Sequence, residues 1–356
     1  MAPLVRALAA TPGVESCVCV TGQHRHMLDQ VLSLFEIEPD IDLKVMTTNQ
    51  TLNGLFARII ESTNKLLMQS RPDYVLVHGE TTTAAAATLS AFHLGIPVGH
   101  VEAGLRTGDV FRPFPEEANR RVIDVMSSLM FAPTTTAKQC LVQEKLSGRI
   151  YVTGNTVIDA LSYVADRLDR DTGVSAGVAA RFPFIDNNKR MVLVTGHRRE
   201  NIGDAFVQIC DALRQIAEDK TLQIVYPVHL NPRVRDTVMP MLSGRANIHL
   251  IEPLDYLEFV WMMKQSTLIL TDSGGIQEEA PFLGKPVLVL RDVTERPEAV
   301  AAGAVHLVGT DSVRIVQSVR RALERMNQQV RVSPYGDGFA SQRIVDALCG
   351  LPVSEF

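Results

Sequence analysis

Residues 266–281 read STLILTDSGGIQEEAP, and this stretch decides the fold that we expect. An apolar, β-leaning run over residues 266–270 is followed by Ser273-Gly274-Gly275 and then by a helix start. Glycines let backbone N–H groups approach an anion, and the dipole of the following helix favours negative charge there. The stretch therefore predicts a strand, a phosphate-binding turn and a helix, which is one repeat of an α/β sheet.

Two carboxylates follow this turn, and the second one extends the predicted site. Glu279 lies about one helical turn beyond Gly275, past the phosphate and next to the neighbouring sugar. A carboxylate there accepts hydrogen bonds from vicinal hydroxyls, as acidic residues do with ribose in dinucleotide folds. We predict that Ser273, Gly274 and Gly275 bind phosphate and that Glu279 binds ribose, while Glu278 complements the helix dipole.

The same alternation of strand and helix patterns runs along the whole chain and predicts parallel sheets with crossover helices. The expected strands cover residues 16–21, 43–46, 74–78, 98–101, 129–132, 150–153, 191–195, 224–228, 248–251, 268–271 and 287–290. Residues 166–189, between the two sets, are rich in charge and turn residues. We expect an α/β protein with two Rossmann-like, doubly wound domains facing across a cleft. Residues 1–155 with a final helix over 339–356 form one, and residues 156–338 form the other.

Composition limits the function. The chain has 356 residues, with 46% hydrophobic and 21% charged residues, as in globular proteins. A net charge of −5 argues against nucleic acid as a partner. No stretch is long and apolar enough to span a membrane, so we expect no membrane partner. The cysteines are scattered, which predicts buried, reduced thiols in a cytoplasmic protein. They are Cys17, Cys19, Cys140, Cys210 and Cys349.

Three carboxylates stand out in the first half of the chain. Glu80 in HGETTT and Glu102 in HVEAG follow strands, and Glu116 in PFPEEANR begins a helix. Carboxylates near the carboxyl ends of strands in one domain are what proton transfer at carbon requires. Two simpler interpretations stay open: a threonine after Glu80 is only a helix N-cap, or Glu116 only pairs with Arg120 four residues later.

A basic cluster follows a strand in the second half. His197, Arg198 and Arg199 come after Gly196, and such side chains suit a diphosphate. A basic cluster in a solvated turn is the alternative. The sequence YPVHLNP at 226–232 forms either a wall for a base or only a turn. We find no P-loop lysine, no GxGxxG fingerprint and no metal-ligand spacing, which argues against ATP hydrolysis, nicotinamide binding and a metal site.

Taken together, a set of motifs resembles the non-hydrolysing UDP-N-acetylglucosamine 2-epimerases, in matching order over nearly the whole chain. The motifs are VHGETTT, GHVEAGLRTG, PFPEEANR, VTGNTVIDAL, VTGHRREN, YPVHLNPRVR, LTDSGGIQEEAP, GKPVLVLRDVTERPE and SPYGDG. The resemblance implies a GT-B fold and interconversion of UDP-N-acetylglucosamine and UDP-N-acetylmannosamine without a cofactor. UDP is eliminated to give 2-acetamidoglucal and is then added back, and the product supplies surface polysaccharide synthesis. The resemblance also implies a homodimer.

The resemblance assigns roles to individual positions. The acidic catalytic positions match Glu80, Glu102 and Glu116, and the catalytic histidine matches His197. The UDP contacts match Ser273, Gly274, Gly275 and Glu279, and a substrate-side arginine matches Arg120. Part of an activating UDP-N-acetylglucosamine site matches Gln23, His26 and Arg198.

Two departures from the family pattern bear on activity. The family has Asp where this chain has Glu80, and a misplacement of ~1 Å costs on the order of a hundredfold in rate. The family also begins with a strand and a Gly-Thr-Arg-Pro-Glu loop before the segment that matches Met-Ala-Pro-Leu-Val. Residues 1–10 here have the pattern of a helix, so we expect the chain to start one strand late and to be weakly active or inactive.

Three alternatives remain from the sequence. A hydrolysing 2-epimerase shares the elimination step but releases free N-acetylmannosamine. A GT-B glycosyltransferase uses the same nucleotide domain but does not exchange the C2 hydrogen. A catalytically impaired UDP-sugar-binding protein binds UDP without turnover.

Overall fold

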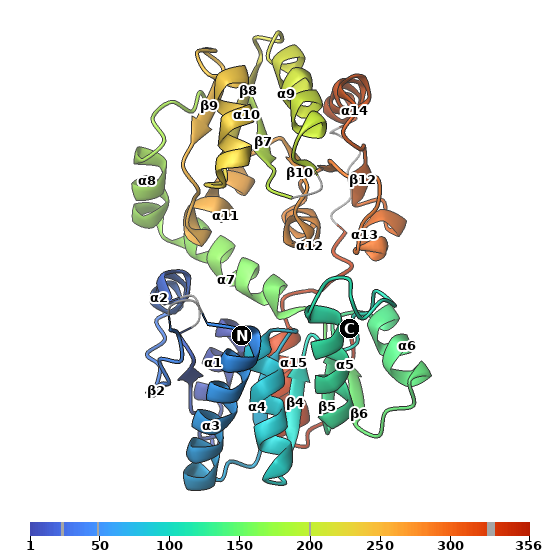
Figure 1. The fold of residues 1–356 in the computed structure, drawn as a ribbon. Helices are drawn as coiled ribbons and strands as arrows, with labels where there is room; N and C mark the ends of the chain where they lie inside the picture. Colours follow the sequence, from blue (N-terminus) through green and yellow to red (C-terminus); the bar gives the residue numbers. More distant parts are fainter. Residues whose placement is uncertain (23–24, 48–49, 199–200, 326–331) are drawn as a thin grey trace. The chain divides into compact units, whose positions relative to one another are not determined.

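Strands and helices alternate along nearly the whole chain, as the ribbon in Figure 1 shows. The computed structural model describes residues 1–22, 25–47, 50–198, 201–325 and 332–356. Unit 1 comprises Met1–Ala160 and Tyr335–Phe356, and unit 2 comprises Leu161–Pro334. Every described strand pairs in parallel with its neighbour, so the predicted α/β class is confirmed. Within the described ranges, no helix is both long and apolar enough to cross a bilayer.

The elements of unit 1 are α1 (Ala2–Ala9), β1 (Cys19–Val20), α2 (Arg25–Leu34), β2 (Ile41–Asp42), α3 (Leu52–Ser70), β3 (Val75–His78), α4 (Thr82–His93), β4 (Val98–Val101), α5 (Glu116–Met126), β5 (Leu129–Ala132), α6 (Thr135–Gln143), β6 (Arg149–Val152) and α15 (Ala340–Leu348). Helix α7 (Thr156–Arg170) starts in unit 1 and ends in unit 2.

The elements of unit 2 are α8 (Thr172–Ala180), β7 (Arg190–Thr195), α9 (Asp204–Ile216), β8 (Leu222–Pro227), α10 (Pro232–Leu242), β9 (Ile248–Ile251), α11 (Tyr256–Gln265), β10 (Leu268–Thr271), α12 (Gly274–Phe282), β11 (Val287–Val289), α13 (Pro297–Ala301), β12 (Val305–Leu307) and α14 (Ser312–Glu324).

Unit 2 is a doubly wound sheet with the strand order β12-β11-β10-β7-β8-β9. The two central strands, β7 and β10, are almost wholly buried apolar runs, which is typical of parallel strands covered on both faces. One core joins the sheet to α9, α10 and α14 through residues such as Val192, Phe206, Val234 and Ile315. The strand order reverses between β7 and β10, and the hydroxyls of Thr195 and Thr271 meet there at 2.6 Å. A ligand crevice is expected at the carboxyl ends of these two strands.

The main sheet of unit 1 has the order β3-β4-β5-β6. Helices α1 and α15 cover one face, where Leu4 and Ile344 pack against Phe131. Helices α3, α4 and α5 contribute to the core on the other face through residues such as Leu67, Ala91 and Ile123. The helix expected over 339–356 therefore forms in unit 1, but it ends at Leu348. The helix expected over residues 1–10 is confirmed as α1.

The first two strands form a separate two-stranded sheet, β1-β2. The strand expected over 16–21 is reduced to Cys19–Val20, and the strand expected over 43–46 lies earlier, at Ile41–Asp42. Among the described residues, no strand joins this pair to β3. Both strands of a two-stranded sheet are edges, so side chains on them have few neighbours to cover them.

Three other expectations are corrected by the structure. Cys17 and Cys19 are exposed, since they lie in or beside the edge strand β1, and Cys349 is exposed just after α15, so the prediction of buried thiols is wrong for them. Residues 166–189 are largely helical, within α7 and α8: the charges at 166–170 lie along the last turns of α7, and α8 carries no charge. Strand β12 was not expected, since exposed His306 interrupts its short apolar run.

Two glycines in the loop after β4 make a matched test of how tightly this loop packs. Gly104 and Gly108 have φ of +86° and +85°. A Cβ added at Gly104 would lie 2.4 Å from the carbonyl oxygen of Ala137 and 2.8 Å from Leu141 Cγ, whereas a Cβ at Gly108 meets nothing within 4 Å.

We expect Gly108→Ala to lower the free energy of unfolding by about 1 kcal/mol through backbone strain alone. Gly104→Ala adds overpacking and should cost roughly 2–5 kcal/mol in total. Urea unfolding of both variants measures the difference. Equal losses would contradict the close packing of Gly104 against α6.

Candidate active site

Glu80 and Glu102 lie at the same edge of the unit 1 sheet. Strands β3 and β4 pair in register, with His78 opposite Val101, and each carboxylate follows its strand by one or two residues. The backbone of Glu102 has φ of +68°, an unusual value for a residue other than glycine. A Cβ added at Gly79 would lie 3.5 Å from Glu102 Oε2. The carboxylate of Glu102 therefore lies against the turn that carries Glu80.

The third carboxylate, Glu116, is the first residue of α5, and Arg120 lies one turn further on. The guanidinium of Arg120 contacts Glu80 Oε2 at 3.6 Å and Glu117 Oε2 at 3.4 Å. Arg120 thus pairs with these two carboxylates. The simpler interpretation from the sequence, in which Arg120 pairs with Glu116, is wrong. Asn119 Nδ2 donates to the backbone oxygen of Glu80 at 2.9 Å, which ties α5 to the β3 turn.

One oxygen of Glu116 differs from those of Glu102, which both have polar neighbours. Glu116 Oε2 is buried and has no hydrogen-bond partner among the described residues. Buried polar atoms in native proteins are nearly always hydrogen-bonded, so an exception needs a partner that arrives later. A bound substrate hydroxyl, amide or water meets that need. The Thr81 side chain, in contrast, accepts from Ala84 N at 3.1 Å, so it is the N-cap of α4.

Asn155 belongs to this site although the sequence alone assigns it no role. It lies three residues after the end of β6, and its Nδ2 donates to Glu102 Oε1 at 3.0 Å. His78 Nε2 lies 3.5 Å from the other oxygen of Glu102. The position of Asn155 shortly after a strand of the same sheet was the signal that could have identified it from the sequence. Both oxygens of Glu102 thus have a neighbouring polar group.

A buried polar network lies next to these residues and was also missed. His100, inside β4, contacts Asp124 Oδ1 at 2.6 Å and the oxygen of Gly79 at 2.9 Å. Asp124 Oδ2 contacts Arg106 at 2.8 Å. His100 and Asp124 have no solvent exposure. Nothing in the sequence distinguished them from other core residues, because they are 24 residues apart in the chain.

In unit 2, Asp272 organises the loop that carries His197. It follows β10, it is fully buried, and it accepts from the backbone N–H groups of His197 and Arg198 at 3.0 and 2.9 Å. Asn201 Nδ2 donates to the same carboxylate at 3.0 Å. Asp272 lies inside the LTDSGG motif but was not singled out from the sequence. It holds the loops after β7 and β10 together.

His197 lies between a carboxylate and a second ring. Its Nδ1 is 3.3 Å from Asp272 Oδ1, and its ring stacks on His229 with centroids 5.6 Å apart. Burial is the main cause that lowers the pKa of His197, and Asp272 opposes the shift. Tyr226, from the YPVHLNP segment, is fully buried and donates to the oxygen of Gly196 at 3.3 Å. Tyr226 therefore supports the loop and does not wall a base.

The phosphate-binding turn predicted from the sequence lies at the amino end of α12. Ser273 is the N-cap residue and makes no side-chain cap bond to its own helix. A Cβ added at Gly275 meets nothing within 4 Å, and one at Gly274 lies 3.6 Å from the Arg198 guanidinium. The first turn of α12 thus presents backbone N–H groups beside a cation, which suits an anion.

Glu279 lies one turn further along α12, as predicted. It is buried and accepts a hydrogen bond from the Tyr256 hydroxyl at 2.7 Å. Burial raises the pKa of Glu279 to about 7, a shift that the Tyr256 bond opposes and Glu278 reinforces. Glu278 itself is buried and pairs with Arg296, so its main contact is an ion pair rather than the helix dipole.

The expected activating site is only partly described. Gln23 lies outside the described residues, and His26 lies in α2, where only the backbone is described. Arg198 is beside the α12 turn, as given above. In the described part of the chain, no cluster of three or more His, Cys, Asp or Glu side chains is arranged to hold a metal ion.

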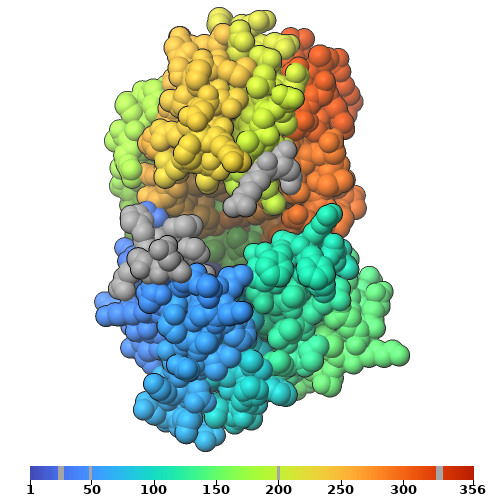
Figure 2. All heavy atoms as spheres, in the orientation of Figure 1, coloured from blue at the N-terminus to red at the C-terminus, as the bar shows by residue number. Residues whose placement is uncertain are grey.

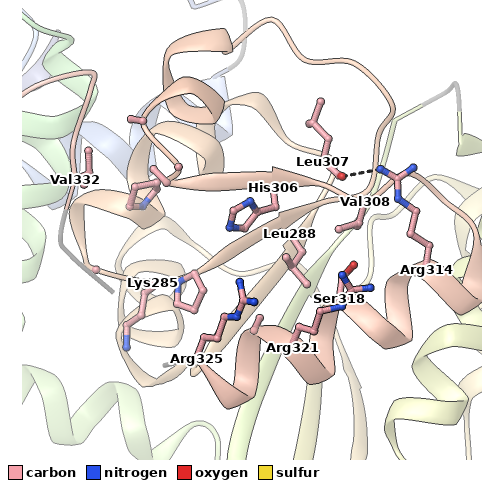
Figure 3. A pocket seen from close by; sticks show the side chains of 17 residues that line it. Lys285, Leu288, His306, Leu307, Val308, Arg314, Ser318, Arg321, Arg325 and Val332 are labelled. Atoms are coloured by element: carbon pink, nitrogen blue, oxygen red, sulfur yellow. Dashed lines mark hydrogen bonds between the residues drawn. The ribbon is translucent and has the colours of Figure 1, made fainter. Parts of the chain in front are cut away.

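A cavity of about 580 Å³ lies elsewhere in unit 2, and Figure 3 shows its lining. It is bounded by residues of β11, β12 and α14, including Leu288, His306 and Arg321. None of the predicted UDP contacts lines it. The predicted UDP contacts lie instead at the carboxyl end of β10 and in the first turns of α12.

Comparisons with known proteins agree with this geometry. A family model described as UDP-N-acetylglucosamine 2-epimerase matches residues 6–349. The UDP-N-acetylglucosamine 2-epimerase of Escherichia coli is 55% identical over 98% of this chain and 94% of its own length.

Solved structures agree as well. The UDP-GlcNAc 2-epimerase of Neisseria meningitidis, bound to UDP-GlcNAc, has a TM-score of 0.89 at 49% identity, over 98% of this chain and 96% of that one. The enzyme of Methanocaldococcus jannaschii, in complex with UDP-GlcNAc and UDP, has a TM-score of 0.80 at 33% identity, over 98% of this chain and 95% of that one. With its α/β units of GT-B type, the chain belongs to the UDP-N-acetylglucosamine 2-epimerase family.

Proposed function

We propose that this chain interconverts UDP-N-acetylglucosamine and UDP-N-acetylmannosamine, with UDP bound by unit 2 and proton transfer performed by unit 1. The observation that carries the proposal is that Glu80 and Glu102 follow neighbouring strands at one sheet edge, and that α5, which begins with Glu116, is tied to that edge through Arg120 and Asn119. One buried oxygen of Glu116 has no hydrogen-bond partner among the described residues. Removing a weakly acidic proton from carbon requires a positioned base.

The proposed reaction has two balanced half-steps. A carboxylate takes the C2 proton, the C–H electron pair forms the C1=C2 double bond, and UDP leaves C1 with the electrons of the C1–O bond. UDP then adds back to C1, and a proton is delivered to the opposite face of C2. The departing diphosphate gains negative charge, and His197, Arg198 and the amino end of α12 supply donors to stabilise it.

Four residues of the α12 segment support the assignment of the UDP half. Ser273, Gly274 and Gly275 present the first turn of α12, and Glu279 lies where a ribose hydroxyl would be accepted. We assign Arg120 to the sugar side because it contacts Glu80. No step of the proposed reaction calls for a cofactor. We place the reaction in the cytoplasm, where free thiols are usual, because all five cysteines are free. We assign the product to surface polysaccharide synthesis.

Proton NMR in deuterated water tests the reaction directly. Incubation with UDP-N-acetylglucosamine should give the manno epimer with deuterium at C2. UDP binding without C2 exchange would sink the proposal and leave a transferase or a binding protein. Free N-acetylmannosamine as the product would instead identify a hydrolysing epimerase.

Glu102→Gln and Glu116→Gln should each lower the rate of C2 exchange by about 10²–10⁴, the usual contribution of a general acid or base. Glu61→Gln, on the exposed face of α3, is the matched control and should leave the rate unchanged. Exchange at the wild-type rate in both site variants would remove these carboxylates from the mechanism.

The environment of Glu279 predicts a pH dependence of UDP binding. Its folded pKa of about 7 lies above the ordinary value, so the carboxylate that accepts ribose hydroxyls is lost as the pH falls through 7. We expect UDP affinity to fall from pH 8 to pH 6 more steeply in the wild type than in Glu279→Gln. The diphosphate also takes up protons in this range, so the difference between the two proteins is the quantity to measure, by calorimetry.

The raised pKa of Glu279 also predicts how the free energy of unfolding changes with pH. Because burial favours protonated Glu279, its contribution to folding is fully present below the ordinary carboxyl pKa and is lost as the pH rises through about 7. Glu279→Gln should therefore be more stable relative to the wild type at pH 8 than at pH 5. A constant difference between the two proteins over this range would contradict the raised pKa.

We further propose that the chain forms a homodimer through the outer face of α3, α4 and α5. Helix α4 packs beside both α3 and α5, and Figure 2 shows α3 and α4, in blue to cyan, at the surface of unit 1. These helices expose Met68, Phe92, Val122 and Val125. Exposed apolar residues on adjoining helices are typical of subunit interfaces.

Val125→Asp should convert such a dimer to monomer in sedimentation velocity experiments. The matched control is Val142→Asp on α6, where the replaced side chain is also exposed but lies outside this face. A wild-type monomer, or a Val125→Asp dimer of undiminished affinity, would reject this interface.

A further inference from the structure

His100 has a demanding position, because both of its ring nitrogens face oxygen atoms inside the core. Its Nδ1 lies 2.6 Å from Asp124 Oδ1 and its Nε2 lies 2.9 Å from the carbonyl oxygen of Gly79. The side chains of His100 and Asp124 are completely buried. Solvent therefore supplies no alternative partner for either nitrogen.

The number of protons on His100 follows from its two partners. A backbone carbonyl oxygen only accepts. Asp124 also takes Arg106 Nη2 at 2.8 Å and the N–H of Gly104 at 3.3 Å on its other oxygen, as an ionised carboxylate does. A neutral imidazole has one N–H and would leave a nitrogen lone pair facing an oxygen lone pair. With Asp124 ionised by its pairing with Arg106, both contacts are satisfied only when both nitrogens carry hydrogen.

The surrounding charges balance such an imidazolium. Arg106 pairs with Glu144 at 2.7 Å as well as with Asp124, so His100, Asp124, Arg106 and Glu144 form a chain of alternating sign. The Arg106 side chain is only 7% exposed. Of the remaining groups near His100, His78 lies on β3 and approaches Glu102 at 3.5 Å. Buried ion pairs contribute little net stability but fix geometry when every member is paired.

The contacts of His100 also reach each segment that carries a catalytic carboxylate. Its own strand, β4, ends one residue before Glu102. Gly79, whose carbonyl it contacts, directly precedes Glu80. Asp124 lies on α5, two turns beyond Glu116. One side chain therefore cross-links the three segments from which the three carboxylates project.

We propose that His100 is a buried imidazolium that acts, with Asp124 and Arg106, as a positioning residue for Glu80, Glu102 and Glu116. The positioning role of His100 rests on the proposed epimerase function. The charge of His100 rests on hydrogen-bond geometry alone. The imidazolium does not touch substrate. It sets the relative position of the carboxylates, and a misplacement of ~1 Å costs on the order of a hundredfold in rate.

The first test is the protonation of the ring in the wild-type chain. Nitrogen-15 NMR at pH 7.5, with the His100 signals assigned by their loss in His100→Gln, should show hydrogen on both Nδ1 and Nε2. A neutral tautomer, with one bare nitrogen, would overturn the charge assignment. This measurement does not depend on catalysis, so it still decides the protonation state if the chain fails to exchange the C2 hydrogen and the proposed function falls.

The second test separates positioning from folding. His100→Gln should lower kcat for C2 exchange on the order of a hundredfold, while the Kd for UDP, which unit 2 binds, stays within about twofold. Asp124→Asn, which keeps size but removes the charge, should show the same split between kcat and Kd. A variant with unchanged kcat would overturn the positioning role. Parallel loss of UDP affinity and of the unfolding transition would reduce the role of the network to stability, which also overturns it.

His249→Gln is the matched control. His249 lies on β9 of unit 2 and stacks on Phe184 with ring centroids 4.5 Å apart, away from the predicted site residues. Loss of this histidine should leave both kcat and the Kd for UDP unchanged. A loss in kcat equal to that of His100→Gln would show that the effect is not specific to the unit 1 network and would overturn the proposal.

Discussion

Parallel strand pairing is the constraint on which the site depends. Because all paired strands run in one direction, the residues that follow them gather at one edge of each sheet. In unit 2 the strand order reverses between β7 and β10, which is the position where a ligand crevice is expected. His197 and Ser273 follow those two strands. In unit 1 the same rule brings Glu80, Glu102 and Asn155 to one edge from three different strands.

Each unit then fixes its loops with one buried aspartate. Asp272 accepts backbone N–H groups from the loop after the neighbouring strand, and Asp124 accepts from His100, Arg106 and a backbone N–H. A buried carboxylate that lost one of these donors would be left partly unsatisfied at substantial cost. The loops therefore have one favourable arrangement before any ligand binds. Such preorganisation is what electrostatic stabilisation of a transition state requires, because donors already in place need no reorganisation.

How well the sequence predicted each element depended on its surroundings. Strands at 98–101, 129–132, 248–251 and 268–271 were placed correctly, because each is a short apolar run bounded by turn residues. Residues 16–21 pair only through Cys19 and Val20, and residues 43–46 lie just beyond their strand β2, since strand length depends on the partners available. Among site residues, only some of those that follow strands were found from the pattern, such as Glu80, Glu102 and His197. Asp272, Asn155 and Asp124 were not, because their contacts join residues 75, 53 and 24 positions apart.

The proposed reaction needs two different proton-transfer groups, and Glu102 and Glu116 differ in their surroundings. Inversion at C2 requires proton removal on one face and delivery on the other, so two groups must approach one carbon from different directions. Glu102 projects from a strand end and has polar neighbours at both oxygens, Asn155 and His78. Glu116 projects from the first turn of a helix and keeps one buried oxygen without a partner among the described residues. Carboxylates that differ in both origin and environment are suited to complementary roles, since the surroundings of a carboxyl group set its readiness to give or take a proton. The network around His100 is then the means by which two groups from separate elements keep a constant separation.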